Sequence, residues 1–129
     1  MAETRRPLSP HLQIYRPMLT MVMSIMHRLT GVALYCGMVL LVWWLSAAAI
    51  SDSCFATVQA VFGHWLGRLV LFGFTWALIH HMLGGLKHFI WDTGRGFDLK
   101  TVELMAKGSL AASIVITLLI WVIGTGVKP

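Results

Sequence analysis

Three long apolar stretches alternate with short polar ones along the chain. They contain no Lys, Arg, Asp or Glu, and they cover residues 29–50, 69–86 and 108–127. A helix needs about 20 mostly apolar residues to cross a bilayer. We therefore predict an all-α fold in which three transmembrane helices span about 24–50, 62–91 and 108–127. Residues 1–129 would form a single membrane-anchor domain.

Composition and charge support a membrane protein and give it an orientation. The chain is 57% hydrophobic and 12% charged, whereas soluble domains are about 25% charged. Of the ten Lys and Arg residues, eight lie in the N-terminal segment or around the link between the second and third helices. The positive-inside rule places both regions on the cytoplasmic side, or on the matrix side in an organelle. This predicts a multi-pass membrane protein. We do not read its basic residues as a nucleic-acid site.

The segment before the first helix has its own character. Residues 1–23 contain Pro7, Pro10 and Pro17, which disfavour a helix there. The segment also carries several apolar side chains and no small-residue cleavage site after a short apolar core, so we do not read it as a signal peptide. We predict a tail that docks on a partner.

Histidines in the second apolar stretch are the main candidates for a functional site, because polar rings are costly in hydrocarbon and usually occur there at functional positions. On a helix, His81, Gly84, Gly85 and His88 share one face. The glycines would leave a flat notch beside an imidazole, which suits a porphyrin, and imidazole is a good ligand for haem iron. Helix packing is the competing interpretation for His81. His80 is rotated off this face, and we interpret it as a packing residue.

A second polar group lies at the start of the first helix. Ser24, His27 and Arg28 share a face, on the same side of the membrane as His81 and His88. An arginine fork suits a haem propionate. Serine and arginine could instead hydrogen-bond a quinone carbonyl, where a cation stabilises the charge that develops on reduction. Anchoring of Arg28 to lipid headgroups is the alternative.

A haem held by two imidazoles needs a second axial histidine. His64 lies near the opposite boundary, and His27 lies at the end of its helix, so neither matches the depth of His81. We therefore expect the second ligand from a partner chain. Three helices also enclose a haem incompletely, which again predicts a second membrane-anchor subunit.

Three blocks of sequence resemble the cytochrome b subunit of succinate dehydrogenase, the larger membrane anchor of respiratory complex II, in its mitochondrial and alphaproteobacterial branch. They are RPLSPHLQIYR at 6–16, SIMHRLTG at 24–31 and HMLGGLKHFIWDTG at 81–94. The three-helix plan is similar too, so the resemblance covers nearly the whole chain. One departure is Lys87, where the family usually has arginine. The charge is kept but the bidentate fork is lost.

The resemblance implies a role for each matching position. The position of His81 is the axial ligand of one haem b iron. Those of Ser24 and Arg28 belong to the ubiquinone site, and those of His27 and Arg28 lie near the haem propionates, where His88 is a further candidate. The implied partners are a flavoprotein subunit, an iron–sulfur subunit and the second anchor. The implied location is the bacterial cytoplasmic membrane, or the mitochondrial inner membrane in an organelle. Succinate would be oxidised at a flavin in a soluble subunit, and this chain would not bind it. No residue of this chain is expected to be catalytic.

Three other functions remain open from the sequence. The chain could be a structural anchor without haem, the anchor of a quinol:fumarate reductase, or a small transporter or metal-binding membrane protein that uses the His80–His81 pair. The N-terminal block favours the succinate-oxidising branch.

Overall fold

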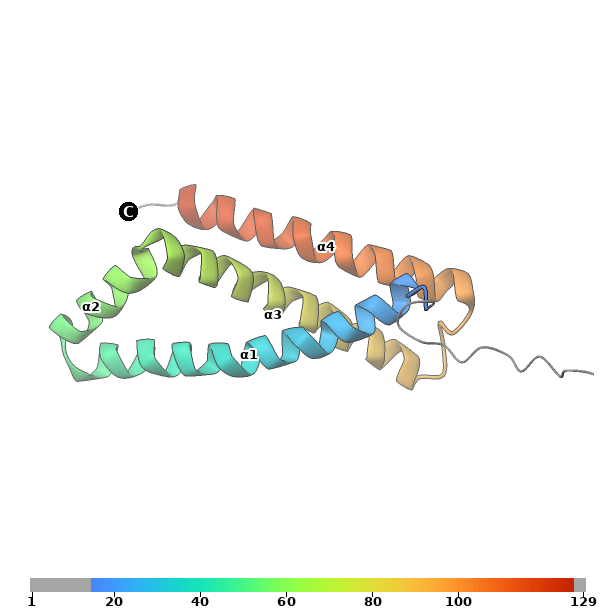
Figure 1. The fold of residues 1–129 in the computed structure, drawn as a ribbon, viewed down its shortest axis with the longest axis horizontal. Coiled ribbons are helices and arrows are strands. Elements are labelled where there is room, and N and C mark those ends of the chain that lie inside the picture. The colour runs from blue at the N-terminus through green and yellow to red at the C-terminus, as the bar shows by residue number, and fades with distance from the viewer. Residues whose placement is uncertain (1–14, 127–129) are drawn as a thin grey trace, which may run out of the picture.

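The computed structural model describes residues 15–126, and this part of the chain is entirely helical (Figure 1). The four helices are α1 (Leu19–Ile50), α2 (Asp52–Gly63), α3 (Trp65–Asp92) and α4 (Leu99–Gly126). α1, α3 and α4 are long and apolar enough to cross a membrane. The predicted all-α, three-helix membrane anchor is therefore confirmed, and the chain is a multi-pass membrane protein. Its orientation in the membrane stays a prediction.

Two of the helices begin earlier than the apolar pattern suggested. α1 starts at Leu19 instead of about residue 24, directly after Met18, whose extended backbone (φ −77°, ψ 155°) follows Pro17. Residues 19–23 of the predicted tail are thus helical, whereas residues 1–14 lie outside the described residues. The expected docking of that tail stays a prediction.

α4 starts at Leu99 instead of about residue 108, because capping and not apolarity sets its beginning. The Asp98 carboxylate accepts a hydrogen bond from the Thr101 backbone N–H at 2.9 Å, which satisfies one of the free donors of a first helical turn. Hydrogen bonds from Thr101 lower the pKa of Asp98, so the cap stays ionised at neutral pH. An ion pair between Lys107 and Glu103, at 2.7 Å, continues this polar first part of the helix.

The predicted helix 62–91 is divided at His64. The backbone of His64 is extended (φ −63°, ψ 150°), and its Nδ1 accepts a hydrogen bond from the Leu66 N–H at 3.4 Å, so the residue caps α3. The turn brings the backbone of Phe62 so close to Gly67 that a Cβ there would lie 2.8 Å from the Phe62 Cα. α2 is consequently a separate short helix that joins α1 to α3 at one end of the bundle (Figure 1).

α1 packs against α3 through glycines that each face a ring on the other helix. A Cβ added to Gly37 would overlap the ring of Phe74, and one added to Gly31 would lie 3.1 Å from the Cε1 of His81. Small residues allow such close approach of transmembrane helices, where packing replaces the hydrophobic effect as the driving force.

α4 packs along the other side of α3. The indole of Trp121 lies edge-on to Phe72, with ring centroids 5.4 Å apart, and donates a hydrogen bond to the Thr75 hydroxyl at 3.2 Å. Ser113 and Thr117 are fully buried, and each hydroxyl donates to a carbonyl of α4 itself. Their polar atoms are therefore satisfied in a setting where an unpaired group is costly.

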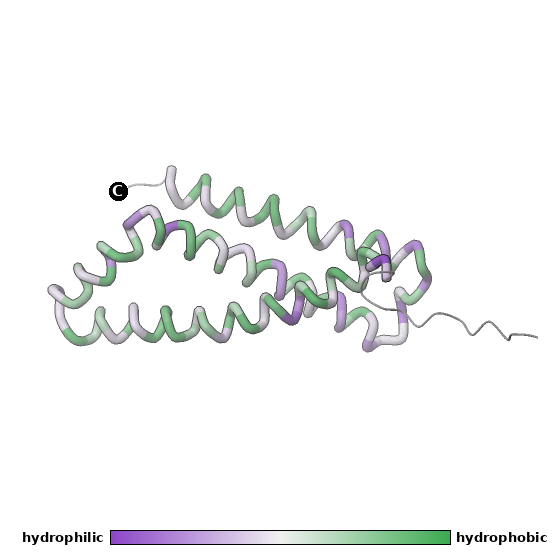
Figure 2. The backbone as a smooth tube through the Cα atoms, viewed as in Figure 1, coloured by the Kyte–Doolittle hydropathy of each residue, from purple (hydrophilic) through white to green (hydrophobic). Residues whose placement is uncertain are grey.

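Most exposed side chains of the three long helices are apolar. Hydrophilic positions gather around the start of α1 and the turn from α3 to α4, which form the polar end, and others lie where α2 meets α3 (Figure 2). Lipid or other membrane subunits can cover the apolar surface. The polar end is where a site with charged or hydrogen-bonding residues can form.

The contact of Gly37 with Phe74 gives a test of the α1–α3 packing. We expect Gly37→Ala to lower the thermal unfolding temperature of the purified membrane complex, because overpacking a close contact costs about 1–3 kcal/mol. Gly73→Ala is the control, since a Cβ there meets no described atom within 4 Å. Adding Phe74→Leu to Gly37→Ala should recover part of the loss. Equal unfolding temperatures for the two alanine variants would contradict the packing.

Candidate haem and quinone site

His27 and His81 form the closest contact between α1 and α3 at the polar end. Their rings stack with centroids 4.0 Å apart and planes 8° from parallel. Each ring also reaches the other's backbone: His27 Nε2 lies 3.2 Å from the His81 carbonyl, and His81 Nδ1 lies 3.0 Å from the His27 carbonyl. Because a carbonyl only accepts, both of these nitrogens donate.

The contact with His27 fixes which nitrogen of His81 is left free. The Nδ1–H points at a backbone carbonyl, with the Thr30 hydroxyl also 3.3 Å away, so the neutral ring leaves Nε2 as its acceptor. No described group hydrogen-bonds that Nε2, and it is not among the buried unpartnered nitrogens, so it reaches the molecular surface. Histidines that bind metal are usually oriented in this way, with the other ring N–H on a carbonyl or carboxylate. The residues present therefore fit an axial ligand at His81.

The two glycines next to His81 differ in what they face. Gly84 is buried, and a Cβ there would overlap the ring of His27. The predicted notch at Gly84 is therefore filled by α1, and that part of the prediction is wrong. Gly85 has no described atom within 4 Å of an added Cβ, so a surface beside it stays open.

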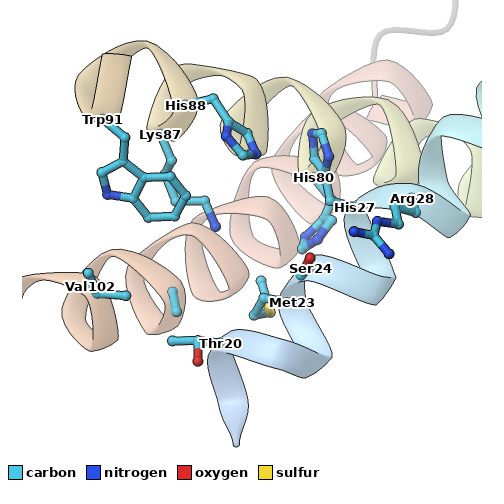
Figure 3. A pocket seen from close by; sticks show the side chains of 12 residues that line it. Thr20, Met23, Ser24, His27, Arg28, His80, Lys87, His88, Trp91 and Val102 are labelled. Atoms are coloured by element: carbon cyan, nitrogen blue, oxygen red, sulfur yellow. The ribbon is translucent and has the colours of Figure 1, made fainter. Parts of the chain in front are cut away.

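A cavity of about 190 Å³ lies on the other side of this contact, between α1, α3 and α4 (Figure 3). It contains four of the five predicted site residues, namely Ser24, His27, Arg28 and His88. The full lining consists of Thr20, Met23, Ser24, His27, Arg28, His80, Gly84, Lys87, His88, Trp91, Val102 and Ala106. His81 is not part of this lining, although its ring stacks on His27, which is.

The charge of the cavity is positive. Arg28 is exposed at its rim and Lys87 is half-buried in its wall, and the described lining residues include no carboxylate. The Ser24 hydroxyl adds a neutral donor. Such a lining favours a ligand that carries hydrogen-bond acceptors or negative charge.

His80, which we interpreted from the sequence as a packing residue, has a second role in the structure. It does pack, with its ring stacked on Trp76 at 5.1 Å, but it also lines the cavity and is only 2% exposed. Its Nδ1 is buried without a hydrogen-bond partner among the described residues. The spacing of residues 76, 80, 84, 87 and 91, which share one helical face of α3, could have indicated from the sequence that His80 faces the same cavity as Lys87 and Trp91.

Comparison with known proteins shows the family of the chain. Residues 2–120 match the family described as succinate dehydrogenase/fumarate reductase transmembrane subunit. The chain is 45% identical over 114 residues to the succinate dehydrogenase cytochrome b556 subunit of Paracoccus denitrificans, covering 88% of each chain. It is 35% identical over 118 residues to the subunit of the same name from Rickettsia prowazekii, covering 92% of each. It is 39% identical over 100 residues to the mitochondrial cytochrome b560 subunit of Sus scrofa, covering 74% of this chain and 58% of that one. The chain therefore belongs to the family of succinate dehydrogenase/fumarate reductase transmembrane subunits.

Proposed function

We propose that this chain is the cytochrome b anchor of a succinate:ubiquinone oxidoreductase. In this role it binds one haem b through His81 and forms part of the ubiquinone-reduction site. The observation that carries the proposal is the orientation of His81, whose Nδ1 is 3.0 Å from the His27 carbonyl while its Nε2 reaches the surface. The names of the relatives, cytochrome b556 and b560 subunits of succinate dehydrogenase, support the same assignment.

His81 would hold the haem iron through Nε2. A bound haem b would supply a one-electron redox centre inside the membrane. The His27 carbonyl keeps the imidazole in the tautomer that has a free Nε2 and raises its basicity. The open surface beside Gly85 is on the same helical face as His81. The expectation that His27 does not match the depth of His81 is wrong, since the two rings stack. Because the Nε2 of His27 donates to the His81 carbonyl and the rings lie face to face, the second axial histidine would still come from the partner anchor.

The residues proposed for the haem propionates lie near this ligand. His27 stacks on His81, and His88 lies next to His27 with ring centroids 5.5 Å apart. Arg28 follows His27 and is exposed, so its guanidinium is free to take a carboxylate from outside the chain. These three side chains would provide the donors and positive charge that propionates need.

Ubiquinone would bind at the cavity, with Ser24 and Arg28 as its ligands. Both residues lie on its wall and are exposed, so a quinone can reach them from the membrane or from a neighbouring subunit. The serine hydroxyl can donate to a carbonyl oxygen. The arginine stabilises the negative charge that develops on that oxygen during reduction.

The remaining parts of the complex would be other chains. A flavoprotein subunit would oxidise succinate, an iron–sulfur subunit would pass the electrons to the quinone site, and this chain would not bind succinate. The N-terminus and the turn between α3 and α4 would face the cytoplasm or matrix, where Arg95, Lys100 and Lys107 follow the positive-inside rule. The apolar outer faces of the helices fit burial in lipid and against the second anchor.

The haem assignment is tested by His81→Ala. We expect the purified complex to lose its reduced b-type absorption while it keeps its flavin, because the substitution removes Nε2, the proposed axial nitrogen. His64→Asn is the matched control, since asparagine preserves the cap of α3. Unchanged b-type absorption in His81→Ala would remove the assigned role. An unmodified complex without such absorption would favour a structural anchor that lacks haem.

The quinone assignment is tested by Arg28→Leu. Loss of a charged hydrogen bond costs about 1.5–3 kcal/mol, so we expect ubiquinone reduction by succinate to fall about 10- to 100-fold. Electron transfer from succinate to a soluble artificial acceptor should keep its rate. The control is Arg68→Leu, which makes the same change near the start of α3, at the opposite end of the bundle from Arg28. It should leave both rates intact. Equal losses in both assays of Arg28→Leu would mean that Arg28 acts through assembly.

A further inference from the structure

His80 is a buried histidine at the inner wall of the cavity, and neither of its ring nitrogens has a partner among the described residues. A buried polar group without a partner costs about 1–3 kcal/mol, and each such group in a folded protein calls for an explanation. A ligand in the cavity can supply the missing partner of Nε2, whereas Nδ1 stays an unprotonated nitrogen without a partner. We propose that His80 hydrogen-bonds one carbonyl oxygen of the bound quinone. This inference rests on the proposed function.

The two nitrogens of His80 differ in their surroundings. Nδ1 is fully buried and has no acceptor near it. Nε2 is not among the fully buried unpartnered nitrogens, so it is the nitrogen that meets the cavity. A neutral imidazole carries one proton, and a site with no acceptor for Nδ1 favours the proton on Nε2. His80 thus presents an N–H donor to the cavity.

The ring is held in place before any ligand arrives. Trp76, one turn earlier on α3, stacks on it with centroids 5.1 Å apart and planes 28° from parallel. Gly84, one turn later, has no side chain and is covered by His27. A donor that is already oriented loses little side-chain entropy on binding, which favours affinity.

Two of the other donors, Ser24 and Arg28, lie towards the exposed side of the cavity, and Lys87 is half-buried in its wall. Ser24 and Arg28 are exposed, whereas His80 is 2% exposed. The part of α4 that lines the cavity, Val102 and Ala106, offers no polar side chain. A quinone has two carbonyl oxygens on opposite sides of its ring. Ser24 and Arg28 can bind one of them at the rim while His80 binds the other inside.

The two ends of the cavity would have different functions. Arg28 faces the oxygen on which charge is stabilised during reduction, and His80 fixes how deeply and in which direction the ring enters. His80 would be a binding residue, so its removal should weaken quinone affinity more than it slows turnover at saturating quinone.

The test uses the purified complex with short-tailed ubiquinone. His80→Phe keeps an aromatic ring on Trp76 but removes the donor, and His80→Gln keeps a donor of similar reach. We expect His80→Phe to raise the KM for the quinone about three- to tenfold, the size that loss of one uncharged hydrogen bond gives. The kcat of His80→Phe should change less. In His80→Gln, the KM should return most of the way to the value of the parent complex. Reduction of a soluble acceptor and the b-type absorption should stay as in the parent complex.

Three results would overturn the proposal. One is an unchanged KM in His80→Phe. Another is His80→Gln behaving like His80→Phe, which would mean that the donor is irrelevant. The third is a parallel loss of the soluble-acceptor rate or of the b-type absorption, which would make His80 a packing residue. If Arg28→Leu still loses ubiquinone reduction in these cases, the proposed function stands without the role of His80.

Discussion

The mutual contact of His27 and His81 is the interaction on which the rest of the site depends. Two parallel rings, 4.0 Å apart, each donate to the backbone carbonyl of the other residue, so α1 and α3 are fixed in register and distance at this level of the membrane. A hydrogen bond costs more to leave unmade in hydrocarbon than in water. One contact therefore sets both the packing of the helices and the free nitrogen of His81.

Glycines make that contact sterically feasible. Gly84 leaves the space that the His27 ring fills, and Gly31 leaves the space beside His81. The same device recurs at Gly37, where Phe74 enters α1. Because the rings of one helix enter gaps in the other, the bundle gains specific packing without burying a large apolar core. The consequence for function is that Ser24, Arg28 and His80 line a cavity beside this contact, whereas His81 is outside the cavity lining.

Much of the architecture could be predicted from the sequence, because a membrane span is a matter of length and apolarity. The limits of the helices could not, since they depend on local hydrogen bonds: Asp98 begins α4 before the apolar stretch, and His64 divides α2 from α3. In the site, helical phase alone grouped His81 with Gly84. It could not show that His27 from α1 occupies the gap at Gly84, or that His80 meets a cavity built by three helices. Such facts depend on how helices pack, and that is the information that a single-helix pattern lacks.

The most direct test of the account is an experimental structure of the complete membrane complex with its haem, at a resolution that shows side-chain hydrogen bonds. The account predicts that the Nε2 of His81 is the axial nitrogen that this chain gives to the iron, and that its Nδ1 remains within hydrogen-bonding distance of the His27 carbonyl. An iron held instead by His80 or His88, or a His81 ring turned away from His27, would contradict it.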